Sequence, residues 1–173
     1  MTTKRAIRIA LFTSVLCIVT VLIPPINIGG VPVTLQTFVV MLSALLLSPQ
    51  DALLSTVLYL VLGVIGLPIF SGFQSGLVGL LGPTGGFLLA FPLASFLISM
   101  LAKKKPFIIT LLFIFLFGII LPYAGGALSL SLYYQTSYWK SWMLLVVFVP
   151  FDIVKATLSI LVAKRLQTIH FFQ

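Results

Sequence analysis

Six apolar stretches separated by loops are the feature that most constrains this chain. They cover roughly residues 6–23, 34–48, 50–65, 86–101, 106–134 and 138–163. Only 7% of the 173 residues are charged, against about 25% in an ordinary soluble domain. Inside a bilayer every backbone N–H and C=O group must be paired within the protein, which favours helices. The sequence therefore predicts a single all-α integral membrane domain, residues 1–173, with six transmembrane helices.

Prolines and glycines indicate where the helices begin, end or break. We expect the first helix to end at Pro24-Pro25, and the fifth to be interrupted at Pro122 and Gly125-Gly126. Ser48 and Asp51 flank Pro49 and are typical of a helix start, where a hydroxyl caps and a carboxylate meets the positive end of the helix dipole. The second stretch is short, because about 20 residues are needed to cross the hydrocarbon core.

The basic residues indicate how the chain is oriented. With six spans, eight of the ten Lys and Arg residues fall on one side: Lys4, Arg5, Arg8, Lys103, Lys104, Lys105, Lys164 and Arg165. Lys140 falls on the other side, and Lys155 lies within the sixth stretch. This positive-inside bias predicts that both termini are cytoplasmic, in a multi-pass protein of a bacterial cytoplasmic membrane. The net charge of +8 does not indicate nucleic-acid binding, because the basic residues form no continuous stripe.

Two glycine-rich loops, 24–33 and 66–85, would both lie on the outer side. They are apolar rather than strongly solvated. Non-helical backbone at membrane depth is tolerated where it is buried in protein or lines a cavity. We therefore expect an outward-facing ligand pocket there, with ordinary extracellular loops as the alternative.

Asp152 and Lys155 are the strongest candidate site residues. Both lie inside the sixth stretch, where a charged side chain costs roughly 2.5–3.5 kcal/mol on insertion scales. Their three-residue spacing puts them on one helix face, and Pro150 just before them frees a backbone carbonyl. A structural ion pair is the alternative, but buried ion pairs are a weak source of stability. We favour a ligand-binding role.

Weaker polar candidates surround the two outer loops. Those expected to bind ligand are Thr34, Gln36, Gln74, Thr84 and Tyr123, with Thr37 and Ser75 beside them. Gln36 suits either a pocket or a hydrogen bond between helices. The aromatic residues from Tyr133 to Trp142 are better explained as an interfacial belt.

Small residues recur every fourth position on the first helix, at Ala6, Ala10 and Ser14. Such a stripe lets another helix approach closely in a membrane.

Catalytic and metal-site patterns are missing from the sequence. Cys17 and His170 are the sole cysteine and histidine, which excludes a zinc cluster or a Cys-His nucleophile pair. The sequence has no second carboxylate near Asp152, no G-x-S-x-G motif and no P-loop. We expect a protein that is not an enzyme and that holds no metal or cofactor; if it pumps, another subunit or an ion gradient supplies the energy.

Four segments resemble the BioY family, the biotin-specific S components of energy-coupling factor (ECF) transporters. They are VPVTLQT (31–37), LYLVLGVIGLPIF (58–70), GPTGGF (82–87) and PFDIVK (150–155), in the family's order. The resemblance implies a six-helix S-component fold that binds one biotin from outside. It also implies that Ala6 and Ala10 dock on a transmembrane T subunit, with two ATPase subunits supplying energy.

The chain departs from the family at Phe151, usually Gly, at Phe87, usually Tyr, and near Ser129, often aromatic. Asp152 and Lys155 are kept, so the polar anchor carries over but the exact lining does not.

Biotin suits these residues chemically. Its ureido ring has two N–H donors and a carbonyl acceptor, its second ring is apolar, and its tail ends in a carboxylate. Asp152 suits the ureido N–H groups, and Lys155 suits either the ureido oxygen or the tail carboxylate. The alternatives are an S component for another vitamin and a non-transport membrane scaffold with the same fold.

Overall fold

A computed structural model describes residues 2–23, 26–28 and 31–168, with backbone alone for 26–28 and 31–33. Pro24 and Pro25, which we expected to end the first helix, and His170 lie outside the described residues. The helices are α1 (Thr3–Leu22), α2 (Gln36–Leu46), α3 (Pro49–Val64), α4 (Gly76–Leu81), α5 (Gly85–Leu101), α6 (Phe107–Ile114), the π-helix η1 (Phe115–Ile120), α7 (Leu121–Tyr133), α8 (Tyr138–Val146) and α9 (Val149–Leu166).

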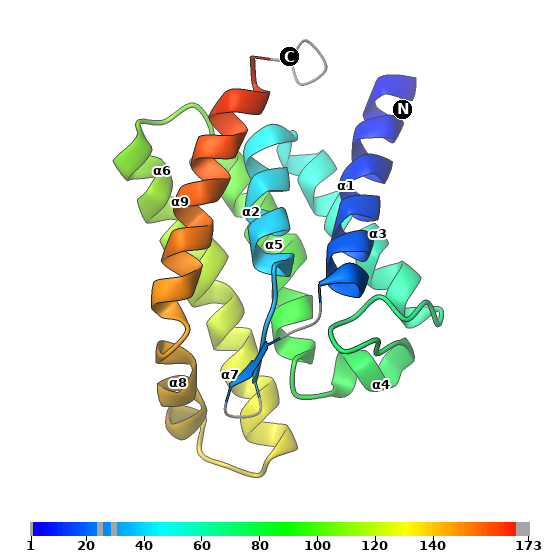
Figure 1. Cartoon of the computed structure of the whole chain (residues 1–173), viewed down its shortest axis with the longest axis vertical. Helices are drawn as coiled ribbons and strands as arrows, with labels where there is room; N and C mark the ends of the chain where they lie inside the picture. Colours follow the sequence, from blue (N-terminus) through cyan, green and yellow to red (C-terminus); the bar gives the residue numbers. More distant parts are fainter. Residues whose placement is uncertain (1, 24–25, 29–30, 169–173) are drawn as a thin grey trace.

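The helices run roughly along one direction and form a bundle (Figure 1). The start of α1 and the last turns of α9 lie at the same end, and α4 lies at the other. By length and apolarity, α1 and the 27-residue helix Phe107–Tyr133 qualify as membrane spans in the described chain, and the bent pair α8–α9 is a third candidate. The helices α2, α3 and α5 are apolar but shorter. The count of six spans remains a prediction.

The loop 24–33 contains an antiparallel hairpin, which the sequence analysis missed. Strand β1 (Ile26–Ile28) pairs with β2 (Val31–Val33), with Ile26 opposite Val33 and Ile28 opposite Val31. Pairing of these backbone groups removes much of the cost of placing an irregular segment beside a membrane.

The expected interruption of the fifth helix is wrong. Helices α6, η1 and α7 are continuous, and Pro122 lies in the first turn of α7 directly after the six residues of η1. A proline ring collides with the carbonyl of an ordinary α-helical turn and removes a donor. The wider π-helical turns before Pro122 make room for the ring, so the helix continues.

The sixth stretch is not one straight helix, in contrast to the expected span 138–163. Helices α8 and α9 meet at 58° around Val147 and Phe148. Pro150 lies in the first turn of α9, where its missing N–H has no helical acceptor to lose. Asp152 therefore lies at the beginning of a helix and not near the centre of one.

The predicted helix start at Ser48 is confirmed. Ser48 is the N-cap of α3, and its hydroxyl accepts a hydrogen bond from the Asp51 N–H at 3.3 Å. Asp51 is buried in the first turn and forms an ion pair with Arg5, which joins the beginning of α1 to the beginning of α3.

The helix α2 forms the centre of the core. Its residues from Val39 to Leu46 are all buried, and it packs against α9, α5 and α1. Beside it, α5 and α7 cross in close contact at Gly86 and Gly125, where a Cβ atom on either residue would collide with the backbone of the other. This crossing fixes the spacing of two helices that line the candidate ligand-binding cavity.

Candidate ligand-binding site

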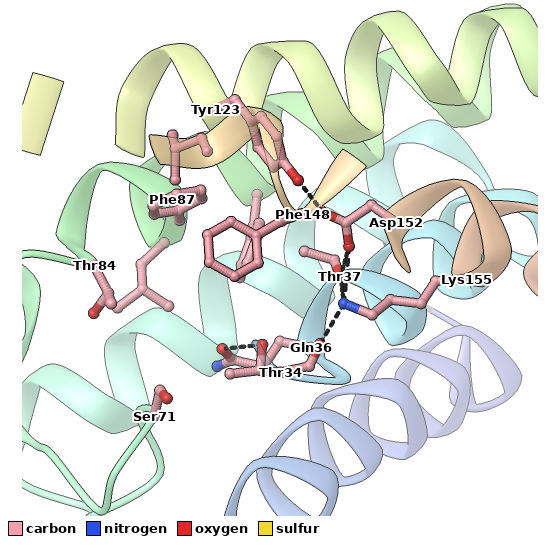
Figure 2. A pocket seen from close by; sticks show the side chains of 13 residues that line it. Thr34, Gln36, Thr37, Ser71, Thr84, Phe87, Tyr123, Phe148, Asp152 and Lys155 are labelled. Carbon is pink, nitrogen blue, oxygen red and sulfur yellow. Dashed lines mark hydrogen bonds and ion pairs between the residues drawn. The ribbon is translucent and has the colours of Figure 1, made fainter. Parts of the chain in front are cut away.

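A small cavity lies among α2, α5, α7, α9 and the loop after α3 (Figure 2). Its lining residues are Thr34, Gln36, Thr37, Ser71, Thr84, Phe87, Leu88, Phe91, Tyr123, Leu145, Phe148, Asp152 and Lys155. Its volume is about 60 Å³, well below the roughly 300–1,000 Å³ of typical ligand pockets. A vitamin-sized ligand would therefore have to move part of the wall when it binds.

The ion pair of Asp152 and Lys155 lies at the polar side of this cavity. Lys155 Nζ is 2.8 Å from Asp152 Oδ1, and Tyr123 donates its hydroxyl hydrogen to Asp152 Oδ2 (Figure 2). Asp152 is only 5% exposed. Its position in the first turn of α9 adds the favourable field of the helix N-terminus to the charge of Lys155. The buried carboxyl group therefore has a basic partner, a hydroxyl donor and a helix N-terminus around it.

Lys155 joins α9 to the beginning of α2. Its ammonium group donates to the Thr34 carbonyl at 2.8 Å, to the Thr37 hydroxyl at 3.3 Å and to Asp152. A lysine has three N–H donors, so all three are used. A ligand acceptor at Lys155 would have to replace one of these bonds.

Ser71 has a buried polar atom available to a ligand. Its Oγ atom is buried, lines the cavity and has no hydrogen-bond partner among the described residues. Buried polar groups without a partner are rare in native structures. An unpaired hydroxyl facing a cavity is the arrangement expected where a ligand or a water completes the site.

Aromatic rings form the apolar walls. Phe87 and Phe91 come from one face of α5, and Phe148 comes from the bend between α8 and α9. The Phe87 ring lies edge-on to Tyr123 with centroids 6.1 Å apart, and it occupies space over Gly126. An apolar ring system would fit between these walls.

The structure brings together six of the seven residues predicted to bind ligand. Thr34, Gln36, Thr84, Tyr123, Asp152 and Lys155 all line the cavity. Whether they contact a ligand stays a prediction.

Gln74 lies apart from the cavity and is exposed. Its carbonyl accepts from the Phe70 N–H at 3.0 Å in an isolated bridge, which turns Gln74 outward while Phe70 packs inward. Ser71 from the same loop lines the cavity instead.

The apolar lining was not predicted, apart from Phe87 as a departure from the family pattern. Phe87, Leu88 and Phe91 have the spacing of one helix face, which is a usable signal. Phe148 offered no such signal, because its position depends on the bend between α8 and α9.

The small-residue stripe lies on the surface. Ala6, Ala10 and Ser14 are all exposed on α1, while Ile9 and Phe12 face the core. The described residues contain no group of three His, Cys, Asp or Glu side chains placed to hold a metal.

A bundle of apolar helices with a buried ion pair beside an aromatic-walled cavity is typical of the class of membrane-embedded proteins with a site for a small molecule. The chain belongs to the BioY family, whose model matches residues 1–170. This confirms the resemblance found in the sequence motifs.

Among its relatives, the chain is 35% identical over 167 residues to the biotin transporter BioY of Thermotoga maritima, covering 96% of this chain and 98% of the relative. It is 43% identical over 147 residues to the biotin transporter BioY2 of Lactococcus lactis subsp. cremoris, covering 84% and 80%. It is 38% identical over 143 residues to the probable biotin transporter BioY of Pyrococcus horikoshii, covering 82% and 84%.

A solved structure shares the whole fold. The crystal structure of the S-component for biotin from an ECF-type ABC transporter superposes with a TM-score of 0.90 at 30% identity, and each chain is covered completely. The all-helical membrane fold of the S-component type is thereby confirmed. These relatives are transport proteins and not enzymes, which agrees with the expected absence of catalysis.

Proposed function

We propose that this chain is the high-affinity biotin-binding S component of an ECF transporter and mediates biotin uptake across the cytoplasmic membrane. The observation that carries the proposal is the cavity itself. It combines a buried acid–base pair, an unpaired buried hydroxyl at Ser71 and aromatic walls. Membership of the BioY family and the likeness to the solved S-component for biotin support the choice of ligand.

Biotin matches the distribution of polar and apolar groups in the cavity. The Asp152 carboxylate accepts hydrogen bonds and suits the two ureido N–H groups. Lys155 and the Ser71 hydroxyl donate, and suit the ureido oxygen or the tail carboxylate. The rings of Phe87, Phe91 and Phe148 suit the apolar ring of biotin. The ligand would exchange the Lys155 bond to Thr34 or Thr37 for a bond of its own.

The proposed membrane arrangement has six spans: α1, α2, α3, α5, the continuous helix Phe107–Tyr133, and the bent pair α8–α9. The end that carries the beginning of α1 and the end of α9 would face the cytoplasm, because the basic clusters lie there. The hairpin and α4 would then lie on the outer side, near the cavity. This orientation gives biotin access from outside.

The proposed partners are a transmembrane T subunit and two ATPase subunits. The exposed stripe of Ala6, Ala10 and Ser14 supports docking on a helix of the T subunit, since close packing drives helix association in lipid. The chain has no P-loop of its own, so ATP hydrolysis belongs to the ATPase subunits.

The proposal is tested by retention of radiolabelled biotin on the detergent-purified chain. We expect bound label to be displaced by excess unlabelled biotin and not by an equal excess of thiamine or riboflavin. Retention of another labelled vitamin, with no retention of biotin, would identify an S component of different specificity. Absence of binding by every vitamin would favour a scaffold role.

A further inference from the structure

Tyr59 is a buried residue of α3 whose hydroxyl lies next to the cavity wall without lining the cavity. It comes from the segment 58–70, none of whose residues lines the cavity. Its side chain is 0% exposed, and its ring packs edge-on against Phe70 with centroids 5.7 Å apart. Its hydroxyl contacts both the Gln36 amide and the Ile69 carbonyl. Tyr59 therefore connects the cavity wall to the loop 66–75.

The Tyr59 hydroxyl has Thr20 of α1, Gln36 and the Ile69 carbonyl as hydrogen-bonding neighbours. The Tyr59 O–H has a single hydrogen, which it donates to the Ile69 carbonyl oxygen at 2.7 Å. The same oxygen must then accept from Gln36, so the amide turns its Nε2 group toward Tyr59. The other end of the amide, Oε1, accepts from the Thr34 hydroxyl at 3.3 Å. These two bonds orient the Gln36 amide, with Nε2 toward Tyr59 and Oε1 toward Thr34.

This orientation leaves Gln36 with a donor to spare. An amide nitrogen has two hydrogens, and one of the two on Gln36 has no acceptor among the described residues. Gln36 is 3% exposed and lines the cavity. A ligand oxygen, either a carbonyl or a carboxylate, would complete it.

Phe70 holds the neighbouring Ile69, the loop residue that contacts Tyr59, in place. Its ring occupies the space over Gly63 and contacts Gly79 of α4, positions where a larger residue would collide with it. The Phe70 N–H also donates to the Gln74 carbonyl at 3.0 Å. The Ile69 carbonyl therefore has a fixed position from which to accept the Tyr59 hydrogen.

We propose that Tyr59 is a positioning residue for the biotin site. It makes Gln36 a hydrogen-bond donor toward a ligand oxygen, and it couples the loop 66–75 to the cavity wall. The proposal rests on the proposed function, because it assigns Tyr59 and Gln36 roles toward the same ligand.

A double-mutant cycle with biotin affinity as the readout separates positioning from general stability. Tyr59→Phe removes the hydroxyl and keeps the ring, and Gln36→Met keeps the side-chain length and removes the amide. We expect each change to raise the Kd for biotin roughly tenfold, and Tyr59→Phe to raise it less than about twofold in the Gln36→Met background. Tyr133→Phe, which removes an exposed hydroxyl, should leave the Kd unchanged. Equal effects of Tyr59→Phe in both backgrounds, or no effect in the wild-type background, would overturn the proposal.

Hydrogen–deuterium exchange of the loop 66–75 in the ligand-free protein gives a second readout. We expect faster exchange in Tyr59→Phe than in the wild type and in Tyr133→Phe, and unchanged exchange would overturn the coupling. If the wild type binds no biotin, the proposed function fails, and loop exchange still decides the role of Tyr59. If Tyr59→Phe does not fold, wild-type affinity in Gln36→Met would refute the donor role and a tenfold loss would support it.

Discussion

Asp152 and Lys155 are the residues whose burial is hardest to explain by stability alone. Taking two charges out of water costs several kcal/mol each, and well-packed apolar residues often replace a buried ion pair without loss. Here the pair faces a cavity and is bonded to Thr34, Thr37 and Tyr123. A pair kept at this cost and placed at a cavity is consistent with a role in ligand binding.

Asp152→Asn and Lys155→Ala should each weaken biotin binding by about 1–3 kcal/mol, because each leaves a buried polar partner unsatisfied. Both variants should still insert in the membrane, since the change removes a charge from a span. Lys140→Ala is a matched control, because Lys140 is exposed on α8. Equilibrium binding of labelled biotin to the purified variants measures the effect. Wild-type affinity in both variants would mean that the pair is purely structural.

Single residues also show where sequence reasoning reached its limit. Asp152, Lys155 and Gln36 stand out because polar groups are rare in apolar stretches, and the structure places all three at the cavity. Gln74 looked equivalent, but the local turn of its loop directs it outward. Tyr59 resembled any other apolar-segment tyrosine, because its role depends on contacts with residues 36 and 69.

Among the elements, the crossing of α5 and α7 sets the width of the site. Gly86→Ala should push the two helices apart, because the added Cβ atom would collide with the backbone carbonyl of Gly125. Phe87 and Tyr123 lie beside this crossing, so we expect a lower melting temperature and weaker biotin binding together. Thermal unfolding in detergent and biotin titration measure the two effects. Leu128→Ala, an exposed change on α7, should alter neither, and an unperturbed Gly86→Ala protein would contradict this account of the crossing.

If α1 docks on a T subunit, bulky substitutions on its exposed face should affect biotin uptake without affecting biotin binding. Ala6→Trp or Ala10→Trp should abolish biotin uptake in cells that co-express the T and ATPase subunits, while the purified variant still binds biotin. Bulk on this exposed face holds a partner helix away, and association in lipid depends on close approach. Ile7→Trp, which enlarges a side chain that is already large and 50% exposed, should have a smaller effect. Normal uptake in the Ala6→Trp and Ala10→Trp variants would show that this face contacts lipid alone.

Helix existence was predictable from the apolar stretches, but the breaks within them were not. Most helix ends in the structure lie within a few residues of the ends of the expected apolar stretches. Proline was a poor guide to interruption, because Pro122 follows a π-helical segment inside a continuous helix and Pro150 begins a new one. Which outcome a proline produces depends on the turns before it and on packing, and neither is visible in composition.

For the whole molecule, the fold positions an ion pair, the Ser71 hydroxyl and four aromatic rings around a cavity of about 60 Å³, smaller than a vitamin needs. The loop 66–75 and the hairpin lie at the end of the bundle where α4 lies (Figure 1). The site is therefore bounded partly by helices and partly by segments outside them.

Isothermal titration of the purified chain with biotin tests the central claim most directly. We predict saturable binding of one biotin per monomer, with competition by unlabelled biotin in a parallel labelled assay. No heat and no competition by biotin, while another vitamin binds, would contradict the assignment of biotin as the ligand of this cavity.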